Sequence, residues 1–159
     1  MKDDTPVVLV FSGPNGSGKS TVTNGFEIVG EYINADEIKK LKRCSDLEAA
    51  QEATLLRQSF TFETVLSSPR NSKLLKMAKR CGYWIEVVFV LTHDVEINVN
   101  RVKNRVKNGG HDVPEDKIRS RYKKSLLNLS DNCAKKLLNN EINMDEYIVI
   151  VKQKTESLK

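Results

Sequence analysis

The sequence predicts an α/β fold in which a mostly parallel sheet of about five strands is flanked by helices. Short apolar runs alternate with helical segments along the 159 residues, and the connections between them are short. The first run, VVLVF at residues 7–11, is continuously apolar, as expected of a parallel strand buried on both faces. No repeat or linker divides the chain. We therefore predict one domain spanning residues 1–159, with a frayed tail at 153–159.

Four more strands are expected after the first. They lie at residues 30–36, 59–65, 84–92 and 146–152, which read GEYINAD, SFTFETV, WIEVVFVLT and EYIVIVK. Each is short and rich in β-branched or aromatic residues.

Helical segments separate these strands. Ser45 and Glu48 form a capping box that opens the helix DLEAAQEATLLRQ. Ser68 followed by Pro69 starts the next helix, which Gly82 ends, because proline favours the first helical turn and glycine the position after a helix.

Two further helices are expected at residues 94–108 and 115–129, and each has an apolar stripe at helical spacing. The stripes consist of Val95, Val99, Val102 and Val106 in the first helix, and Ile118, Tyr122, Leu126 and Leu129 in the second. We expect the first stripe to pack on the sheet.

Composition excludes several classes of protein. No apolar run approaches the ~20 residues that span a bilayer, and the start, MKDDTPVVLVF, has acids where a signal peptide has bases. We therefore expect a cytoplasmic protein with no membrane partner. The three cysteines lie far apart without CxxC spacing, which favours neither disulfides nor a zinc site. The formal charge of +5 suits anionic ligands, but the few aromatic residues and the lack of a basic tail argue against nucleic acid.

Residues 13–20, GPNGSGKS, match the GxxxxGKS pattern of a P-loop. Its glycines let backbone N–H groups turn toward phosphate oxygens, and the following helix adds its positive N-terminal end. The motif lies between a strand and a helix, which distinguishes it from a chance glycine-rich turn. The fold class is thereby narrowed to a P-loop NTPase or kinase-like three-layer fold. The residues expected to bind ATP are Gly13, Pro14, Asn15, Gly16, Ser17, Gly18, Lys19, Ser20 and Thr21.

Three members of this loop have individual roles in the prediction. Lys19 reaches the β- and γ-phosphates, Ser20 ligates Mg²⁺, and Thr21 bonds the α-phosphate. The chain has no LSGGQ or NKxD motif and is short for an AAA module, so a small-molecule kinase with a mobile lid is the favoured class.

Carboxylates follow two of the expected strands. Asp36 ends YINAD and Glu63 ends FTFE, and ligands of parallel sheets bind at the carboxyl ends of strands. If both strands flank the P-loop strand, one carboxylate can accept the proton of an attacking hydroxyl while the other orients the acceptor. Asp36 could instead cap the helix EIKKLK. Asp94 could serve as a Walker B aspartate, but we favour it as the N-cap of the next helix.

Arginines surround the pair Gly109 and Gly110, in a lid predicted at about residues 101–125. A single arginine here would be a solvated side chain, whereas four around a glycine hinge favour a clamp on a transferring phosphoryl group. They are Arg101, Arg105, Arg119 and Arg121, of which the last two flank the second apolar stripe on opposite sides. His111 either contacts phosphate or substrate, or caps the turn.

The motifs FSGPNGSGKST, YINADEI, SFTFETVLS, GGHDVPEDKIRSRY and SLLNL, in this order, resemble the zeta-toxin-like P-loop kinases over about residues 7–129. The resemblance implies transfer of phosphate from ATP to a sugar hydroxyl of UDP-N-acetylglucosamine, and restraint by a small antitoxin protein. It implies that Asp36 is the catalytic base. It also implies that Lys19 and Ser20 handle ATP and Mg²⁺. Acceptor binding would fall to Glu63, Thr64 and His111, and the γ-phosphate clamp to Arg105, Arg119 and Arg121.

Several functions remain compatible with the sequence. The leading hypothesis is an ATP-dependent phosphotransferase acting on a small hydroxyl-bearing acceptor such as a UDP-sugar. The same apparatus could serve a nucleoside, an antibiotic or a polynucleotide end. A nucleotide-binding relic or regulatory protein would bind ATP with little turnover. A nucleic-acid binder would have an affinity for nucleic acid that falls steeply with salt and does not depend on Lys19.

Overall fold

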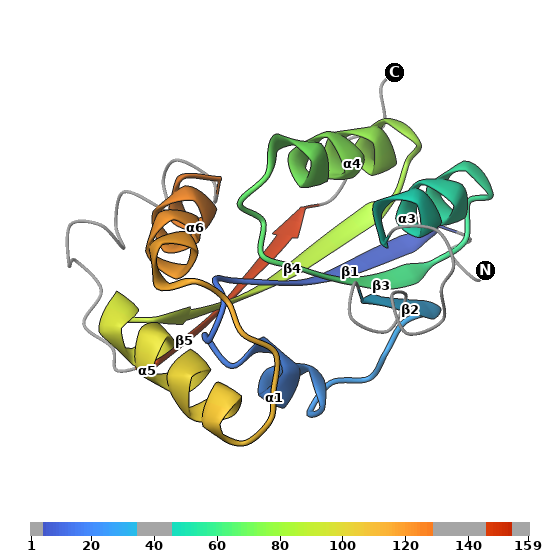
Figure 1. The fold of residues 1–159 in the computed structure, drawn as a ribbon. Helices are drawn as coiled ribbons and strands as arrows, with labels where there is room; N and C mark the ends of the chain where they lie inside the picture. The colour runs from blue at the N-terminus through green and yellow to red at the C-terminus, as the bar shows by residue number, and fades with distance from the viewer. Residues whose placement is uncertain (1–4, 35–45, 129–145, 154–159) are drawn as a thin grey trace.

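The computed structural model describes residues 5–34, 46–128 and 146–153 (Figure 1). In chain order its elements are β1 (Val7–Ser12), α1 (Lys19–Thr23), β2 (Glu31–Asn34), α3 (Asp46–Leu55), β3 (Phe60–Thr64), α4 (Pro69–Arg80), β4 (Trp84–Thr92), α5 (Val95–Lys107), α6 (Glu115–Asn128) and β5 (Glu146–Gln153).

Within these residues the strands form one sheet in the order β2-β3-β1-β4-β5. The first four strands are parallel, and β5 pairs antiparallel with β4. The P-loop strand β1 therefore lies at the centre, between β3 and β4. The α/β fold and the mostly parallel five-stranded sheet predicted from the sequence are confirmed.

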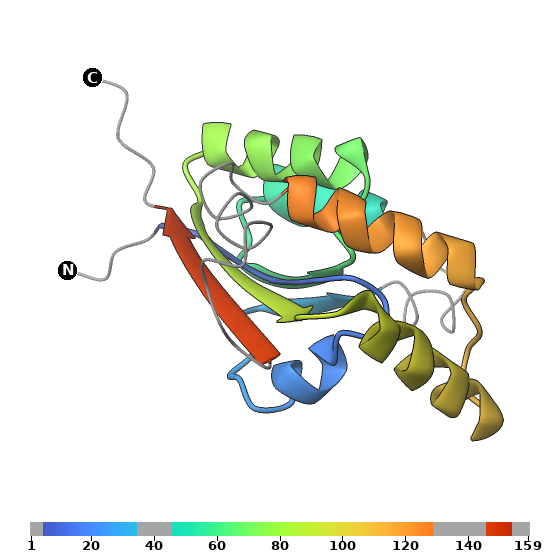
Figure 2. The same ribbon diagram turned by 90° about the vertical axis from the view of Figure 1, so that its left-hand side faces the viewer.

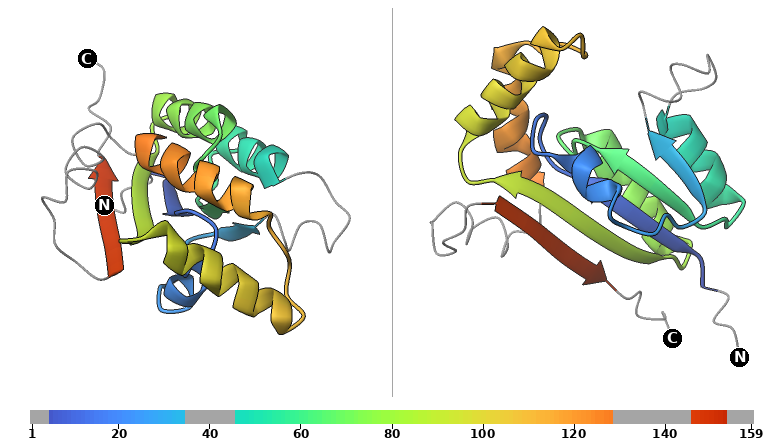
Figure 3. Two further views of the ribbon diagram at one scale, coloured as in Figure 1. Left: turned by 60° about the vertical axis from the view of Figure 1, so that its left-hand side comes forward. Right: turned by 90° about the horizontal axis from the view of Figure 1, so that it is seen from below.

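Helices cover both faces of the sheet (Figure 2). On one face Ala50 and Ala53 of α3 and Leu74 and Ala78 of α4 join a buried cluster with strand residues that include Phe62. On the other face the segment from α1 to β2 supplies Val22, Phe26 and Val29 against Leu9, Phe11, Val88 and Val90. Figure 3 shows α1 on the side of the sheet opposite α3 and α4. This is the three-layer arrangement expected of the fold.

The helix boundaries follow the capping signals. The side chain of Ser68 accepts a hydrogen bond from the Arg70 N–H, and that of Asp94 accepts one from the Glu96 N–H. The assignment of Asp94 as an N-cap is therefore confirmed. Helix α3 ends at Leu55, earlier than the predicted residue 58, because Arg57 has a left-handed backbone with φ 53°.

Helices α5 and α6 lie side by side beyond the carboxyl end of β4 (Figures 1 and 3). Their buried residues Val99, Val102 and Ile118 form one cluster with Val113 of the connecting segment. The middle of the α5 stripe, Val99 and Val102, is thus buried against α6 and the connecting segment rather than on the sheet as expected, and Val106 at its end is exposed.

Some predictions lie outside the described residues. These include Asp36, the capping serine Ser45, and the tail after Gln153. Among the described helices, none combines the length and the apolar character needed to cross a membrane.

Candidate active site

The loop between β1 and α1 packs tightly on β4 and α5. Gly13 has φ +147°, and a Cβ atom there would lie 2.1 Å from the carbonyl oxygen of Val90. Gly16 has φ +78°, and its Cβ would lie 2.5 Å from the carbonyl oxygen of Asn98. Only glycine fits at these positions, because a side chain would meet backbone as well as adopt a disfavoured conformation.

Lys19 bends back over the loop that precedes it. Its Nζ donates to the carbonyl oxygens of Gly13 at 2.9 Å and Pro14 at 3.1 Å. The hydroxyls of Ser20 and Thr21 follow on exposed positions that line a cleft. The ammonium group and both hydroxyls therefore border the same space as the loop backbone.

The cleft has a volume of about 590 Å³. Segments far apart in the sequence line it: the P-loop, the ends of β2 and β3, the start of α4, and the α5–α6 pair. Its lining residues are Asn15, Gly16, Gly18, Lys19, Ser20, Thr21, Asn34, Glu63, Thr64, Val65, Ser67, Asn71, Arg101, Val102, Arg105, His111, Val113 and Arg121.

Glu63 lies at the carboxyl end of β3, directly beside β1 in the sheet. The Tyr32 hydroxyl donates to Glu63 Oε2 at 2.6 Å and accepts from Asn34 Nδ2 at 3.2 Å. This chain of donors holds one carboxylate oxygen from β2. The condition that both strands flank β1 is not met, since β3 lies between β1 and β2, the strand before Asp36.

Thr64 follows Glu63 and is held on the cleft wall by its neighbours. Its Oγ1 accepts from the Leu66 N–H at 3.2 Å and from Asn71 Nδ2 of α4. Since the hydroxyl proton is not used in these two bonds, Thr64 retains a donor that can serve a ligand.

Three arginines of the α5–α6 pair reach the cleft. Arg101 donates to the carbonyl oxygen of Ser17 at 3.3 Å, and Arg121 donates to Asn15 Oδ1 at 3.2 Å. Arg105 donates to the carbonyl oxygen of His111 at 2.8 Å. The pair thus contacts the P-loop directly, from both of its helices.

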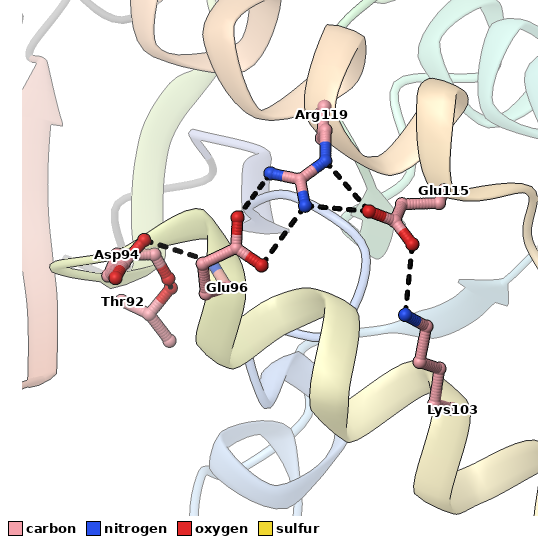
Figure 4. Close-up of polar contacts among 6 residues, drawn as sticks. All are labelled: Thr92, Asp94, Glu96, Lys103, Glu115 and Arg119. Carbon is pink, nitrogen blue, oxygen red and sulfur yellow. Dashed lines mark hydrogen bonds and ion pairs between the residues drawn. The ribbon is translucent and has the colours of Figure 1, made fainter.

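Arg119 is not brought to the cleft. Its guanidinium is engaged by the carboxylates of Glu96 on α5 and Glu115 on α6, and Lys103 approaches Glu115 at 2.9 Å (Figure 4). Hydrogen bonds to Glu96 and then Glu115 raise the pKa of Arg119, and those from Arg119 and Lys103 lower the pKa of Glu115. Two residues along a helix turn by about 200°, so Arg119 faces away when Arg121 faces the P-loop. The predicted contact of Arg119 with a γ-phosphate is not supported.

Comparison with known proteins identifies the family. The family described as Zeta toxin matches residues 32–158, well over half of the chain. The chain belongs to the zeta toxin family. An uncharacterized protein of Haemophilus influenzae is 32% identical over an alignment of 127 residues, and the match covers 72% of this chain and 91% of that relative. The P-loop at residues 13–20 precedes the matched range, so motif and match are independent observations.

A solved structure titled "Structure of the Pnkp1/Rnl/Hen1 RNA repair complex" contains a chain with the same fold. The TM-score is 0.63 at 16% identity, and the alignment covers 91% of this chain and 48% of the other. This chain therefore spans about half the length of that protein, and the likeness concerns the fold alone. Membership of the zeta toxin family, together with the GPNGSGKS motif, indicates a P-loop phosphotransferase of the kinase type.

The cleft of this zeta toxin family member fits a nucleoside triphosphate with Mg²⁺. Lys19 and three arginines border it against the single carboxylate of Glu63 among its described lining residues, which suits a polyanion. The glycine-rich loop can turn its backbone N–H groups toward phosphate, and Ser20 offers the hydroxyl that such sites use for the metal.

Sequence reasoning missed Asn98, which is fully buried on α5 and donates from Nδ2 to the Asn15 carbonyl oxygen at 2.8 Å. A signal was present. Asn98 falls on the same helical face as Val95 and Val102, and a polar residue within an apolar stripe needs a buried partner. Asn34, Ser67 and Asn71 were also missed, since nothing in their spacing distinguishes them from surface residues.

Proposed function

We propose that this protein transfers the γ-phosphoryl group of ATP to a hydroxyl of a small acceptor, UDP-N-acetylglucosamine or a related UDP-sugar. One observation carries the proposal. The P-loop, the carboxylate of Glu63 and three arginines of the α5–α6 pair border one cleft of about 590 Å³. That combination provides a phosphate cradle, a polar wall for a hydroxyl-bearing ligand and positive charge between them.

On the nucleotide side, Lys19 would leave the carbonyl oxygens of Gly13 and Pro14 and bind the β- and γ-phosphates. Ser20 would hold Mg²⁺, which neutralises charge on the phosphate oxygens when bound. Thr21 would bond the α-phosphate. Arg105 and Arg121 would stabilise the charge on the transferring group, an effect worth several kcal/mol in comparable sites, about 3–4 kcal/mol for one oriented donor.

On the acceptor side, Glu63 accepts a hydrogen bond from a sugar hydroxyl with the oxygen that Tyr32 does not hold. Thr64 donates its free proton, and His111 closes the wall near Arg105. The acceptor assignment comes from the zeta toxin family resemblance, and the polar side chains of the cleft offer hydrogen-bond partners for sugar hydroxyls.

The transfer is a single displacement. The acceptor oxygen bonds to the γ-phosphorus while the bond from that phosphorus to the bridging oxygen breaks, and ADP leaves with the electron pair. The hydroxyl proton passes to a base. We propose Asp36, which follows β2 and lies outside the described residues.

The test is ADP release with ATP, Mg²⁺ and a panel of acceptors that includes UDP-N-acetylglucosamine, a nucleoside, an aminoglycoside and an RNA with a 5′-hydroxyl. We expect release to depend on the UDP-sugar and to vanish in Lys19→Ala, while Lys79→Ala, an exposed lysine on α4, retains it. Asp36→Asn should bind ATP but not turn over. If the protein binds ATP but releases no ADP with any acceptor, the proposed transfer is wrong and a nucleotide-binding regulatory protein is indicated instead.

The setting of this activity is also a proposal. A toxin of this kind would act in the cytoplasm, where ATP and UDP-sugars are present, and a small antitoxin would restrain it. Co-purification of the chain with the product of a neighbouring gene would support such a partner, and unrestrained expression without loss of growth would contradict it.

A further inference from the structure

Asn98 contacts the P-loop through both its side chain and its backbone. Its Nδ2 donates to the Asn15 carbonyl oxygen at 2.8 Å, and its Oδ1 accepts from the Thr92 hydroxyl at the end of β4. The backbone carbonyl oxygen of Asn98 also lies against Gly16, since a Cβ atom added to Gly16 would be 2.5 Å from that oxygen. The Asn98 side chain is fully buried, so water does not compete at the amide itself.

The same network reaches the second helix of the pair. The Tyr122 hydroxyl of α6 donates to the Thr92 carbonyl oxygen at 2.6 Å, and Arg121 donates to Asn15 Oδ1 at 3.2 Å. Asn15 is therefore held at its backbone from α5 and at its side chain from α6. The contact at its backbone comes from the fully buried Asn98 and involves no charge.

We infer that Asn98 is a positioning residue for phosphate binding: it fixes the Asn15–Gly16 turn so that the loop backbone faces the cleft. Asn98 does not line the cleft and acts through Asn15. Its orientation is chemically determined, because a carbonyl oxygen can only accept, so the NH₂ end of the amide must face Asn15. This inference rests on the proposed function in one respect only, the expected effect of Asn98 on the affinity for ATP.

The decisive variant is Asn98→Asp, which keeps the shape of the side chain but replaces the donor with an oxygen facing the Asn15 carbonyl. Losing a buried donor and leaving its partner unpaired should raise the Kd for ATP about tenfold or more. The matched control is Asn100→Asp, the same exchange at an exposed position of α5. Thr92→Val adds no charge; it removes the donor to Asn98 Oδ1 and should raise the Kd about fivefold.

Two readouts separate positioning from general stability. The first is the Kd for ATP by calorimetry, together with the melting profile of each variant. The second is the amide spectrum of protein labelled with ¹⁵N-glycine, in which eight glycines are visible and Gly13, Gly16 and Gly18 report on the loop. We expect these three resonances to shift in Asn98→Asp and Thr92→Val without nucleotide, while that of Gly82, at the far end of α4, stays in place.

Several results would overturn the inference. One is a Kd for Asn98→Asp no higher than that for Asn100→Asp, and another is a uniform shift of all eight glycine resonances. If the parent protein fails to bind ATP, the proposed function is wrong, and the spectrum still decides: unchanged loop resonances in both variants would refute positioning by Asn98. If Asn98→Asp does not fold, Thr92→Val provides the same comparison.

Discussion

Gly16 and Gly109 offer a matched pair for testing the close packing of the P-loop. Both have left-handed backbones, with φ +78° and φ +80°. A Cβ at Gly16 would lie 2.5 Å from the Asn98 carbonyl oxygen and 3.0 Å from its Cα, whereas a Cβ at Gly109 would meet nothing within 4 Å. Replacing each by alanine therefore imposes the same backbone strain, and a steric clash in only one of them.

The expected magnitudes follow from this difference. A left-handed backbone costs a residue with a side chain about 1–2 kcal/mol, so Gly109→Ala should lower the free energy of unfolding by that amount. At Gly16 the contact is with backbone, which cannot rotate away, and the loop must retreat by roughly 0.5 Å to reach the shortest separation that Cβ atoms adopt. Weakening one N–H bond to a phosphate costs about 1.5–3 kcal/mol, equal to about a 10- to 150-fold loss of ATP affinity.

The assay is calorimetric titration with ATP and Mg²⁺ of both variants beside the parent and Lys19→Ala. We expect Gly16→Ala to approach the weak binding of Lys19→Ala, and Gly109→Ala to bind as the parent does. Equal affinity in Gly16→Ala and the parent would refute the argument that the loop needs this close approach. Equal losses in both glycine variants would show that backbone strain alone is responsible.

Three further predictions concern other parts of the molecule. Arg121→Gln should reduce acceptor-dependent ADP release strongly, whereas Arg119→Gln should leave release unchanged and only lower the melting temperature slightly, an effect that high salt removes. The pKa of Glu115 is lowered in the folded protein. The ionised carboxylate therefore adds stability at pH values above the ordinary pKa of a glutamate, and this contribution is lost as the pH falls through the lowered pKa of the folded protein. The melting temperature should therefore drop in that acid range, and less so in Glu115→Gln. Tyr83→Phe removes the hydroxyl that donates to buried carbonyl oxygens near the end of α3, and urea unfolding should show a loss of about 1–3 kcal/mol with unchanged ATP binding.

The order of the elements was predictable because each local signal agreed with the fold. The run VVLVF, the P-loop after it and the Pro69 start of α4 reappear within one or two residues of their predicted positions. The order of the strands in the sheet was not predictable from such signals. It depends on long-range packing, and it places β3 rather than β2 beside β1. Glu63 therefore lies at the end of a strand that neighbours the P-loop strand, whereas the strand before Asp36 lies one strand further away.

The candidate site was predictable where a residue type carries its own chemistry, as in GPNGSGKS. The site was less predictable where the role of a residue depends on the packing of the helices. The sequence already placed Arg119 and Arg121 on opposite sides of an apolar stripe, and both could not face one phosphate. Glu115 lies four residues before Arg119 on the same helix, but Glu96 comes from α5, so only the packing of α5 on α6 revealed that second partner. Asn98 is the opposite case, because a polar residue on the apolar face of a helix already indicates a buried hydrogen bond.

The packing of α5 on α6 also bears on how the arginines reach a phosphate. A hinge at Gly109 and Gly110 would separate the two helices, and this would expose the cluster of Val99, Val102, Val113 and Ile118 at a cost of about 25 cal/mol for each Å² of apolar surface. Both helices are also tied to Asn15, through Asn98 and Arg121. The structure therefore favours movement of the pair as one body. Under the proposed function, Arg121, which is tied to the loop, would stabilise charge without reorganising during the reaction, the condition under which such donors accelerate transfer most.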